Sequence, residues 1–250
     1  MTSCYNRLIN NLEDLKLNIF RDQLLHYISL IESGQKEITE ALYELTELER
    51  KQREQRMITA CVRTAGFPFL KEISDYDFSF QPGVEKGKIL ELSTLKFLEA
   101  RENIVFCGTP GTGKTHLSVS LGIQAAKNHY STYFINCHEL IEQLKQAQHE
   151  NRLETKLKHY SKYRLLIIDE IGYLNLDKTA ANLLFQLISR RYEKKSTIIT
   201  TNVGFSGWGD LFGDDVTANA ILDRILHHCH VVTINGPSYR TRNIFELNSE

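Results

Sequence analysis

A glycine-rich motif, G-x-x-x-x-G-K-[ST], most constrains what this chain of 250 residues can fold into. Residues 103–107 before it are typical of a strand, and residues 115–128 after it have the apolar periodicity of a helix. A strand, a glycine loop and a helix start form the context that phosphate binding needs. The motif therefore predicts nucleoside triphosphate binding rather than a chance glycine-rich turn. Its residues are Gly108, Thr109, Pro110, Gly111, Thr112, Gly113, Lys114 and Thr115.

The parts of this motif have separate chemical roles. Glycines allow backbone N–H groups to approach the β-phosphate, and the start of the following helix adds partial positive charge. We expect Lys114 to reach the β- and γ-phosphate oxygens. The hydroxyl of Thr115 is expected to ligate Mg²⁺.

Two carboxylates follow an apolar run at residues 165–168. We expect Asp169 to hold Mg²⁺ through its water shell and Glu170 to polarise an attacking water as general base. Paired acids at a strand end can also be solvated turn residues. The phosphate-loop motif upstream favours the catalytic interpretation.

Alternating strands and helices indicate an α/β fold with a parallel sheet covered on both faces. Residues 165–168 are apolar throughout, as expected of a strand buried on both faces. The five candidate strands are residues 104–107, 132–135, 165–168, 197–200 and 231–234.

The residues before this alternation are expected to form separate parts. Residues 1–65 read as a small helical domain that is expected to serve client binding and assembly, with one helix of up to about 30 residues between Gly34 and Gly66. The aromatic-rich residues 66–83 are expected to be a linker that docks by burying its rings. A short helix over residues 84–100 would then lead into the ATPase domain, residues 84–250.

Three further polar residues are candidates for the site. Asn202 follows the strand at 197–200 and could orient the attacking water, or it could be a turn residue. Arg224, in an expected helix at 217–228, could act on a neighbouring subunit's nucleotide or form an ion pair within its own helix. The same two interpretations apply to Arg240.

Some charged clusters allow two interpretations. The charged stretch at 49–56 could face a partner or DNA, and the basic stretch at 145–164 could face DNA phosphates. Each could also simply be a solvated helix face. No carboxylate or cysteine at zinc-site spacing accompanies His227, His228 and His230, so no metal site is predicted there. Trp208 is interpreted as a packing anchor.

Composition is typical of a soluble globular protein, with 42% hydrophobic and 24% charged residues. No apolar run approaches the roughly 20 residues of a membrane helix, and the first residues lack a signal-peptide pattern. The five cysteines show no C-x-x-C spacing. We therefore expect a cytoplasmic protein with reduced thiols and no membrane partner.

Together these residues resemble the IstB family of AAA+ ATPases, which assist insertion-sequence transposases and are related to DnaC-type helicase loaders. The C-terminal blocks are the most specific part of the resemblance. The matching segments are residues 108–115, 166–170, 200–202, 208–213, 220–228 and 236–240.

The resemblance implies ATP as the nucleotide, an AAA+ core with a five-stranded sheet, and hydrolysis of ATP. It implies roles for Asn202 as the sensor-1 residue, Arg224 as an arginine finger acting between subunits, and Arg240 as a sensor-2-like residue. It also implies a homo-oligomer that assembles on double-stranded DNA without sequence preference and contacts a transposase. Few residues follow the last expected strand, so no separate helical lid is predicted.

Three other functions use the same motifs. A DnaC-like helicase loader would share the fold and chemistry but serve a different client. A small-molecule kinase would need an acceptor pocket and an arginine-rich lid, and neither is evident. A DNA-binding adaptor would use ATP only to switch assembly, with slow turnover.

Overall fold

The computed structural model describes residues 4–173 and 176–241. The chain divides into two compact units, Met1–Ala60 and Cys61–Glu250, termed the N-terminal and C-terminal units. Helix α3 (Ile38–Thr64) continues past this division, which lies near the predicted boundary at residue 65. The functions assigned to the separate parts remain predictions.

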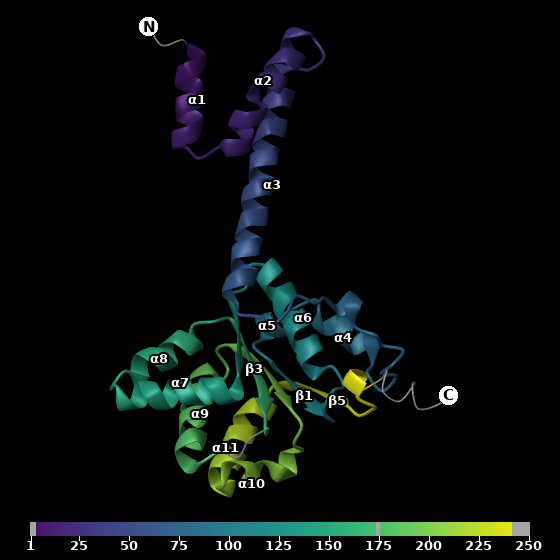
Figure 1. Ribbon diagram of the computed structural model, residues 1–250, viewed down its shortest axis with the longest axis vertical. Helices are drawn as coiled ribbons and strands as arrows, with labels where there is room; N and C mark the ends of the chain where they lie inside the picture. Colours follow the sequence, from purple (N-terminus) through teal and green to yellow (C-terminus); the bar gives the residue numbers. More distant parts are fainter. Residues whose placement is uncertain (1–3, 174–175, 242–250) are drawn as a thin grey trace. The chain divides into compact units, whose positions relative to one another are not determined.

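The N-terminal unit is helical (Figure 1). It contains α1 (Cys4–Asp14), α2 (Asn18–Glu32) and most of α3, whose 27 residues confirm the predicted long helix. Leu12, Leu24 and Leu45 form its small buried core. Apolar residues at helical spacing therefore build this unit by packing α1 and α2 against α3.

A carboxylate of α3 completes the start of α2. The first backbone N–H groups of a helix have no partner within the helix, and the residue before α2, Leu17, cannot supply one from its side chain. Glu49 Oε2 instead accepts hydrogen bonds from the N–H groups of Ile19 (2.7 Å) and Phe20 (3.2 Å). The Glu49 residue is only 3% exposed, so a buried charge is stabilised at the positive end of a helix.

A five-stranded parallel sheet forms the C-terminal unit, with strand order β2-β3-β4-β1-β5. Helices lie on both faces of the sheet (Figure 1). All five predicted strands are confirmed, with slightly longer ends. They are β1 (Asn103–Gly108), β2 (Thr132–Asn136), β3 (Leu165–Ile171), β4 (Ser196–Thr201) and β5 (Cys229–Ile234).

Strand β3 contributes to the core on both faces, as its uninterrupted apolar run predicts. Leu166 and Ile168 pack with α7 (Cys137–His149), α8 (Leu153–Ser161), α9 (Lys178–Arg191), α10 (Trp208–Phe212) and α11 (Asp215–Leu226). Leu165 and Ile167 pack with α4 (Lys86–Leu92), α5 (Lys96–Ala100) and α6 (Lys114–Lys127). The period of two along a strand separates these two cores.

The single helix predicted over residues 84–100 is wrong, because α4 and α5 are separate. Ser93 and Thr94 donate their hydroxyls to the carbonyls of Leu90 and Glu91, which competes with helix continuation. Leu95 then adopts φ +65°, a left-handed conformation that ends the helical path. Its side chain is buried in the core, which offsets the cost of this conformation.

Two predictions near the C-terminal end of the described chain have clear outcomes. Helix α11 begins two residues earlier than predicted, because Asp214 Oδ2 accepts from the Thr217 N–H and caps the helix. Trp208 is fully buried, which confirms its role as a packing anchor.

After β5, the described chain contains one short 3-10 turn, η3 (Tyr239–Thr241). The predicted absence of a lid also concerns residues 242–250, which lie outside the described part.

Two other 3-10 turns, η1 (Ile73–Asp75) and η2 (Phe205–Gly207), complete the described elements. Across residues 4–173 and 176–241, every helix is too short or too polar to cross a lipid bilayer.

Candidate nucleotide-binding site

The glycine-rich motif forms a tight loop between β1 and the start of α6. Gly108 has φ +148°, and a Cβ atom there would lie 1.9 Å from the carbonyl oxygen of Ile234 in β5. Gly113 has φ +91°, and a Cβ atom there would lie 2.5 Å from the ring of Tyr76. Only glycine fits at these two positions, so the backbone can curl closely around a phosphate.

The aromatic linker also shapes this loop. Tyr76 is buried in the core beside α6, and its hydroxyl donates a 2.9 Å hydrogen bond to the carbonyl of Thr112. Phe67 and Phe78 pack against the same core, in agreement with the docking predicted from the ring content of residues 66–83. Desolvation raises the pKa of Tyr76 to about 12, so its hydroxyl remains a donor at neutral pH.

Lys114 is folded back onto the loop. Its Nζ donates to the carbonyl oxygens of Gly108 (2.8 Å) and Thr109 (2.7 Å). Burial lowers the pKa of the Lys114 ammonium, because the charged form loses hydration. Phosphate oxygens in the loop would offer this ammonium opposite charges in place of neutral carbonyls.

Asp169 lies at the carboxyl end of β3, next to the first residues of α6. Its carboxylate accepts hydrogen bonds from Thr115 Oγ1 (3.0 Å) and Thr200 Oγ1 (2.6 Å). The residue is 4% exposed, and burial raises the pKa of Asp169, while the two hydroxyls act in the opposite direction. A buried carboxylate beside a threonine hydroxyl is an oxygen donor set that fits Mg²⁺. Thr115 and Asp169 are therefore the residues that could hold this ion.

Glu170 faces a different direction from Asp169. Its backbone has φ +62°, and the pairing of β3 with β4 shifts register between Ile168 and Ile171. Glu170 is exposed, and its Oε2 accepts a 2.8 Å hydrogen bond from Asn136 Nδ2 at the end of β2. This change in backbone conformation lets two consecutive acids serve different purposes.

A cavity of about 360 Å³ lies over the loop. Its walls include Asn202 at the end of β4 and Arg240 in η3. The positive charge of Arg240 also contributes to the lowered pKa of Lys114, after the larger effect of burial. The cavity thus brings the phosphate loop, the carboxylate of Glu170, Asn202 and Arg240 together. Its remaining walls include linker residues, namely Phe69, Lys71, Asp75, Tyr76, Asp77 and Gln81.

Arg224 lies elsewhere, on α11. Its guanidinium stacks 4.7 Å from the centroid of the Phe185 ring, and Nη1 donates to the carbonyl of Ala220 (2.8 Å). Arg224 does not line the cavity over its own phosphate loop. A role in catalysis would therefore require the nucleotide of another subunit, as the interpretation from sequence assumed.

The sequence interpretation missed two residues of this site. Asn136 is not among the residues predicted from the sequence, although in a parallel sheet the end of β2 lies beside the end of β3. That adjacency was the available signal. Tyr76 was assigned to a docking linker, and nothing in its local sequence indicated a hydrogen bond to the loop backbone.

Fold and site together define the class: this is an ATP-binding P-loop protein with an AAA+ core. Residues 10–246 match the family described as IstB-like ATP binding protein, and the chain belongs to that family.

Three comparisons illustrate the relationship. The chain is 50% identical over 250 residues to a Bacillus thuringiensis subsp. berliner protein named for insertion sequence IS232 and ATP binding, with both chains covered completely. It is 46% identical over 204 residues to a Geobacillus stearothermophilus protein named for IS5376 and ATP binding, covering 82% of this chain and 81% of that protein. A crystal structure of the DnaC helicase loader matches with a TM-score of 0.52 and 24% identity, covering 69% of this chain and 98% of that chain. The last likeness concerns the fold alone.

Proposed function

We propose that this protein is an ATPase that assists an insertion-sequence transposase. It hydrolyses ATP while it assembles as a homo-oligomer on double-stranded DNA in the cytoplasm, and it recruits or stimulates the transposase. The observation that carries this proposal is the full-length similarity to a relative named for an insertion sequence. The two carboxylates beside the phosphate loop support hydrolysis rather than nucleotide binding alone.

The chain's own residues would divide the chemistry. Lys114 would leave the loop carbonyls to neutralise the β/γ-phosphates, while Thr115 and Asp169 would hold Mg²⁺. When bound, Mg²⁺ supplies positive charge to the phosphate oxygens. Glu170 would remove a proton from the attacking water, and Asn202 would orient that water.

Two arginines would complete the site. Arg240 lies at the cavity beside Lys114 and would contact the phosphates in its own subunit. Arg224 would enter the site of a neighbouring subunit and stabilise the charge that develops during phosphoryl transfer. Assembly would then be required for turnover, which suits a protein that acts as an oligomer on DNA.

The basic stretch at 145–164 is the candidate DNA surface. On α8, Lys156 lies 5.3 Å from the centroid of the Tyr160 ring, and Lys158 is exposed. The logarithm of the DNA-binding constant falls linearly with the logarithm of the salt concentration. Replacing both lysines by Gln is expected to make this slope shallower by about 0.9 for each phosphate contact that is lost. Lys194→Gln with Lys195→Gln is the charge-matched control. An unchanged slope in the α8 variant would assign that helix to solvent.

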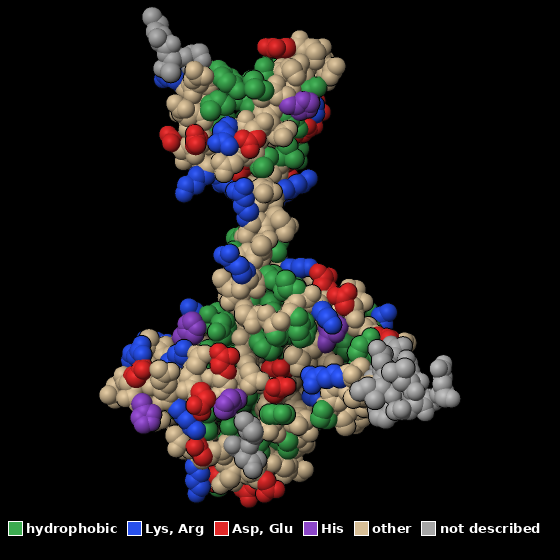
Figure 2. Space-filling model, viewed as in Figure 1, with side chains coloured by type: hydrophobic (Ala, Val, Ile, Leu, Met, Phe, Trp, Pro, Cys, Tyr) green, Lys and Arg blue, Asp and Glu red, His purple; other side chains and the backbone are tan. Residues whose placement is uncertain are grey.

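The N-terminal unit is the candidate surface for assembly and client binding. Figure 2 shows hydrophobic side chains (green) gathered on this unit. An unusual number of large apolar residues is exposed there, and such surfaces commonly mark protein partners. They include Leu8, Leu15, Leu25, Ile38, Leu42 and Tyr43.

The decisive experiment uses the transposase encoded beside this gene, which we expect to be a recombinase with three metal-binding carboxylates. The purified pair should associate in the presence of ATP and DNA, and strand transfer should increase. Binding to a replicative helicase, with no effect on the adjacent recombinase, would replace this proposal by helicase loading. Phosphate transfer to a small molecule would instead indicate a kinase.

A further inference from the structure

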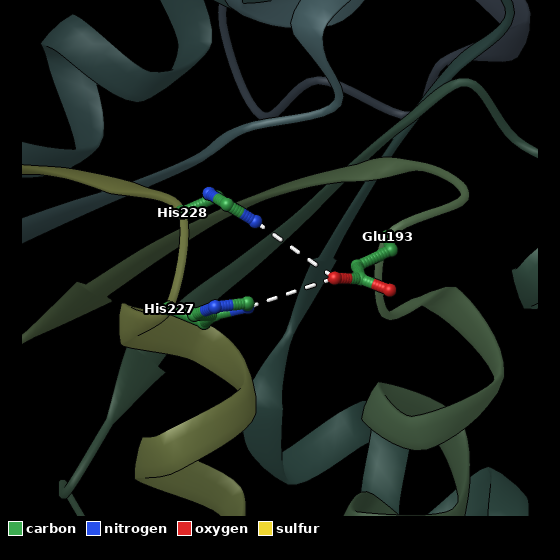
Figure 3. A group of neighbouring side chains, drawn as sticks. All are labelled: Glu193, His227 and His228. Atoms are coloured by element: carbon green, nitrogen blue, oxygen red, sulfur yellow. Dashed lines mark ion pairs between the residues drawn. The ribbon is translucent and has the colours of Figure 1, made fainter.

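Two histidines and one glutamate meet on the surface of the C-terminal unit. Figure 3 shows His227 and His228, which follow α11, facing the carboxylate of Glu193 in the turn between α9 and β4. Glu193 Oε1 lies 3.7 Å from His227 Nδ1 and 3.8 Å from His228 Nε2. One potential ligand atom from each residue lies within 4.8 Å of the others. The interpretation of the sequence missed this group because Glu193 is distant along the chain.

We propose that Glu193, His227 and His228 bind a divalent transition-metal ion of the Zn²⁺ class. Two imidazoles and one carboxylate form a donor set typical of zinc, with a further position open to water. Bonds of 2.0–2.1 Å in a tetrahedral site separate ligand atoms by about 3.3 Å. The two observed separations from Glu193 therefore need to shorten by about half an ångström, and the separation between the two imidazole nitrogens, which is within 4.8 Å, by up to about 1.5 Å. All three side chains are about half exposed, so an ion can enter without opening the fold.

The turn that carries Glu193 is anchored to the core. Arg191 is fully buried, and its guanidinium donates to the carbonyl oxygens of Tyr160 (3.0 Å) and Tyr163 (3.0 Å) and to Thr197 Oγ1 (3.0 Å). These bonds hold the end of α9 next to the start of β4. Glu193 follows two residues later, so its backbone position is largely set before any ion binds.

The histidine segment is anchored in the same way. The carbonyl of His228 accepts a 2.8 Å hydrogen bond from the N–H of Asn103, at the start of β1. Asn103 Oδ1 also accepts from the N–H of Thr197 in β4. Asn103, at the amino end of the sheet, is therefore hydrogen-bonded both to the histidine segment and to the strand that follows the turn of Glu193. Holding the ligand-bearing turns in place before the ion binds reduces the entropy lost on binding.

Neighbouring groups moderate the affinity. Tyr192 Oη lies 2.7 Å from His227 Nδ1 and must yield that nitrogen to the ion. The Arg101 guanidinium donates to the backbone carbonyl of Glu193 and brings a positive charge near the site. Cys229, the next residue in sequence, packs against the apolar core and is not part of the cluster. The ligands are thus imidazole and carboxylate, without thiolate.

This site is separate from the nucleotide site. Its residues precede β4 and β5, whereas the phosphate loop and Asp169 lie at the carboxyl ends of strands in the same parallel sheet. Mg²⁺ prefers oxygen ligands, so it is not expected to compete at two imidazoles. The inference does not depend on the client or on ATP hydrolysis.

The test is calorimetric titration of the full-length protein with ZnCl₂ in the presence of excess MgCl₂. We expect one ion per chain in the wild type, and at least tenfold weaker binding in each of Glu193→Gln, His227→Gln and His228→Gln. The matched controls are His138→Gln and His149→Gln, which change exposed histidines on α7 and should keep wild-type affinity. Circular dichroism and ATP affinity, unchanged in all variants, exclude misfolding as the cause of any loss.

Cobalt offers an independent readout. Co²⁺ bound to this site should give a visible absorption spectrum without the intense near-ultraviolet band of thiolate ligation, and the three variants should lack the spectrum. Zn²⁺ binding that persists in all three variants, or that disappears when the cysteines are alkylated, would overturn the proposal. So would a wild type that binds no ion in the calorimeter.

Discussion

Lys114 and Glu170 separate ATP binding from hydrolysis at the level of single residues. Lys114→Ala removes the ammonium that is expected to neutralise the β- and γ-phosphates, and it should therefore weaken ATP binding. Glu170→Gln removes only the proton acceptor, so ATP should bind with wild-type affinity while hydrolysis falls by about 10²–10⁴-fold. Nucleotide titration and phosphate release measure the two effects. Hydrolysis by Glu170→Gln at the wild-type rate would refute its assignment as general base.

Asn136 donates a hydrogen bond to Glu170, and this contact can be tested without disturbing α7. Asn136 Oδ1 caps α7 by accepting from the His138 N–H, while Nδ2 donates to Glu170. Asn136→Ser keeps a capping oxygen but is too short to reach Glu170.

Loss of the bond should free Glu170 and raise ATP hydrolysis without DNA by up to about tenfold, because Glu170 is exposed and such a hydrogen bond contributes at most about 1.5 kcal/mol net. Phosphate release without DNA measures this change. A fall in activity like that of Glu170→Gln would mean that Asn136 instead holds Glu170 in its working position.

Burial of the Asp169 carboxylate lowers the free energy of unfolding of the protein. Because burial raises its pKa, the folded state disfavours the charged carboxylate, and this cost appears as pH rises above the usual aspartate pKa of about 4. Asp169→Asn should therefore raise the melting temperature of the nucleotide-free protein at pH 7, with a gain that shrinks toward pH 4. Thermal melts across this range test the sign. A gain that is constant with pH would have a cause other than charge burial.

Among whole elements, α2 depends on a carboxylate supplied by α3. Glu49→Ala should destabilise the N-terminal unit by about 1–3 kcal/mol, because two N–H groups at the start of α2 lose their acceptor. Glu47→Ala, which removes an exposed ion pair with Arg50 that solvent screens, should change stability far less. Urea unfolding followed by circular dichroism compares the two. Equal losses would show that the buried cap contributes no more than a surface pair.

Most elements could be predicted from the sequence because their causes are local. The apolar run of β3 and the glycines of the phosphate loop each specify a conformation within a few residues. The hydroxyls of Ser93 and Thr94 are a local signal for the break between α4 and α5, but the left-handed conformation of Leu95 was not predictable, because burial in the core stabilises it. The contact of Asn136 with Glu170 depends on which strands are neighbours, and the Glu193 cluster depends on two turns that meet only in the folded chain.

For the whole molecule, Arg224 provides a test of assembly. Arg224→Ala and Glu170→Gln proteins should each be inactive alone. A mixture should recover some hydrolysis, because one interface can pair an intact Glu170 with an intact Arg224 from the next subunit. Phosphate release across mixing ratios measures the recovery. Its absence in mixtures shown to co-assemble would leave Arg224 with only the contacts to Phe185 and Ala220 within its own subunit.

The buried packing anchor of α10 also gives the molecule an optical property. The chain has a single tryptophan, Trp208, and its indole N–H donates to the carbonyl of Val203, the residue after Asn202. The tryptophan fluorescence of the whole protein, excited where tyrosine does not absorb, therefore arises from one buried indole that is hydrogen-bonded just after the end of β4. A shift of the end of β4 when a nucleotide binds would change the surroundings of Trp208 and therefore its emission. Nucleotide binding can then be followed by tryptophan fluorescence without attaching a dye.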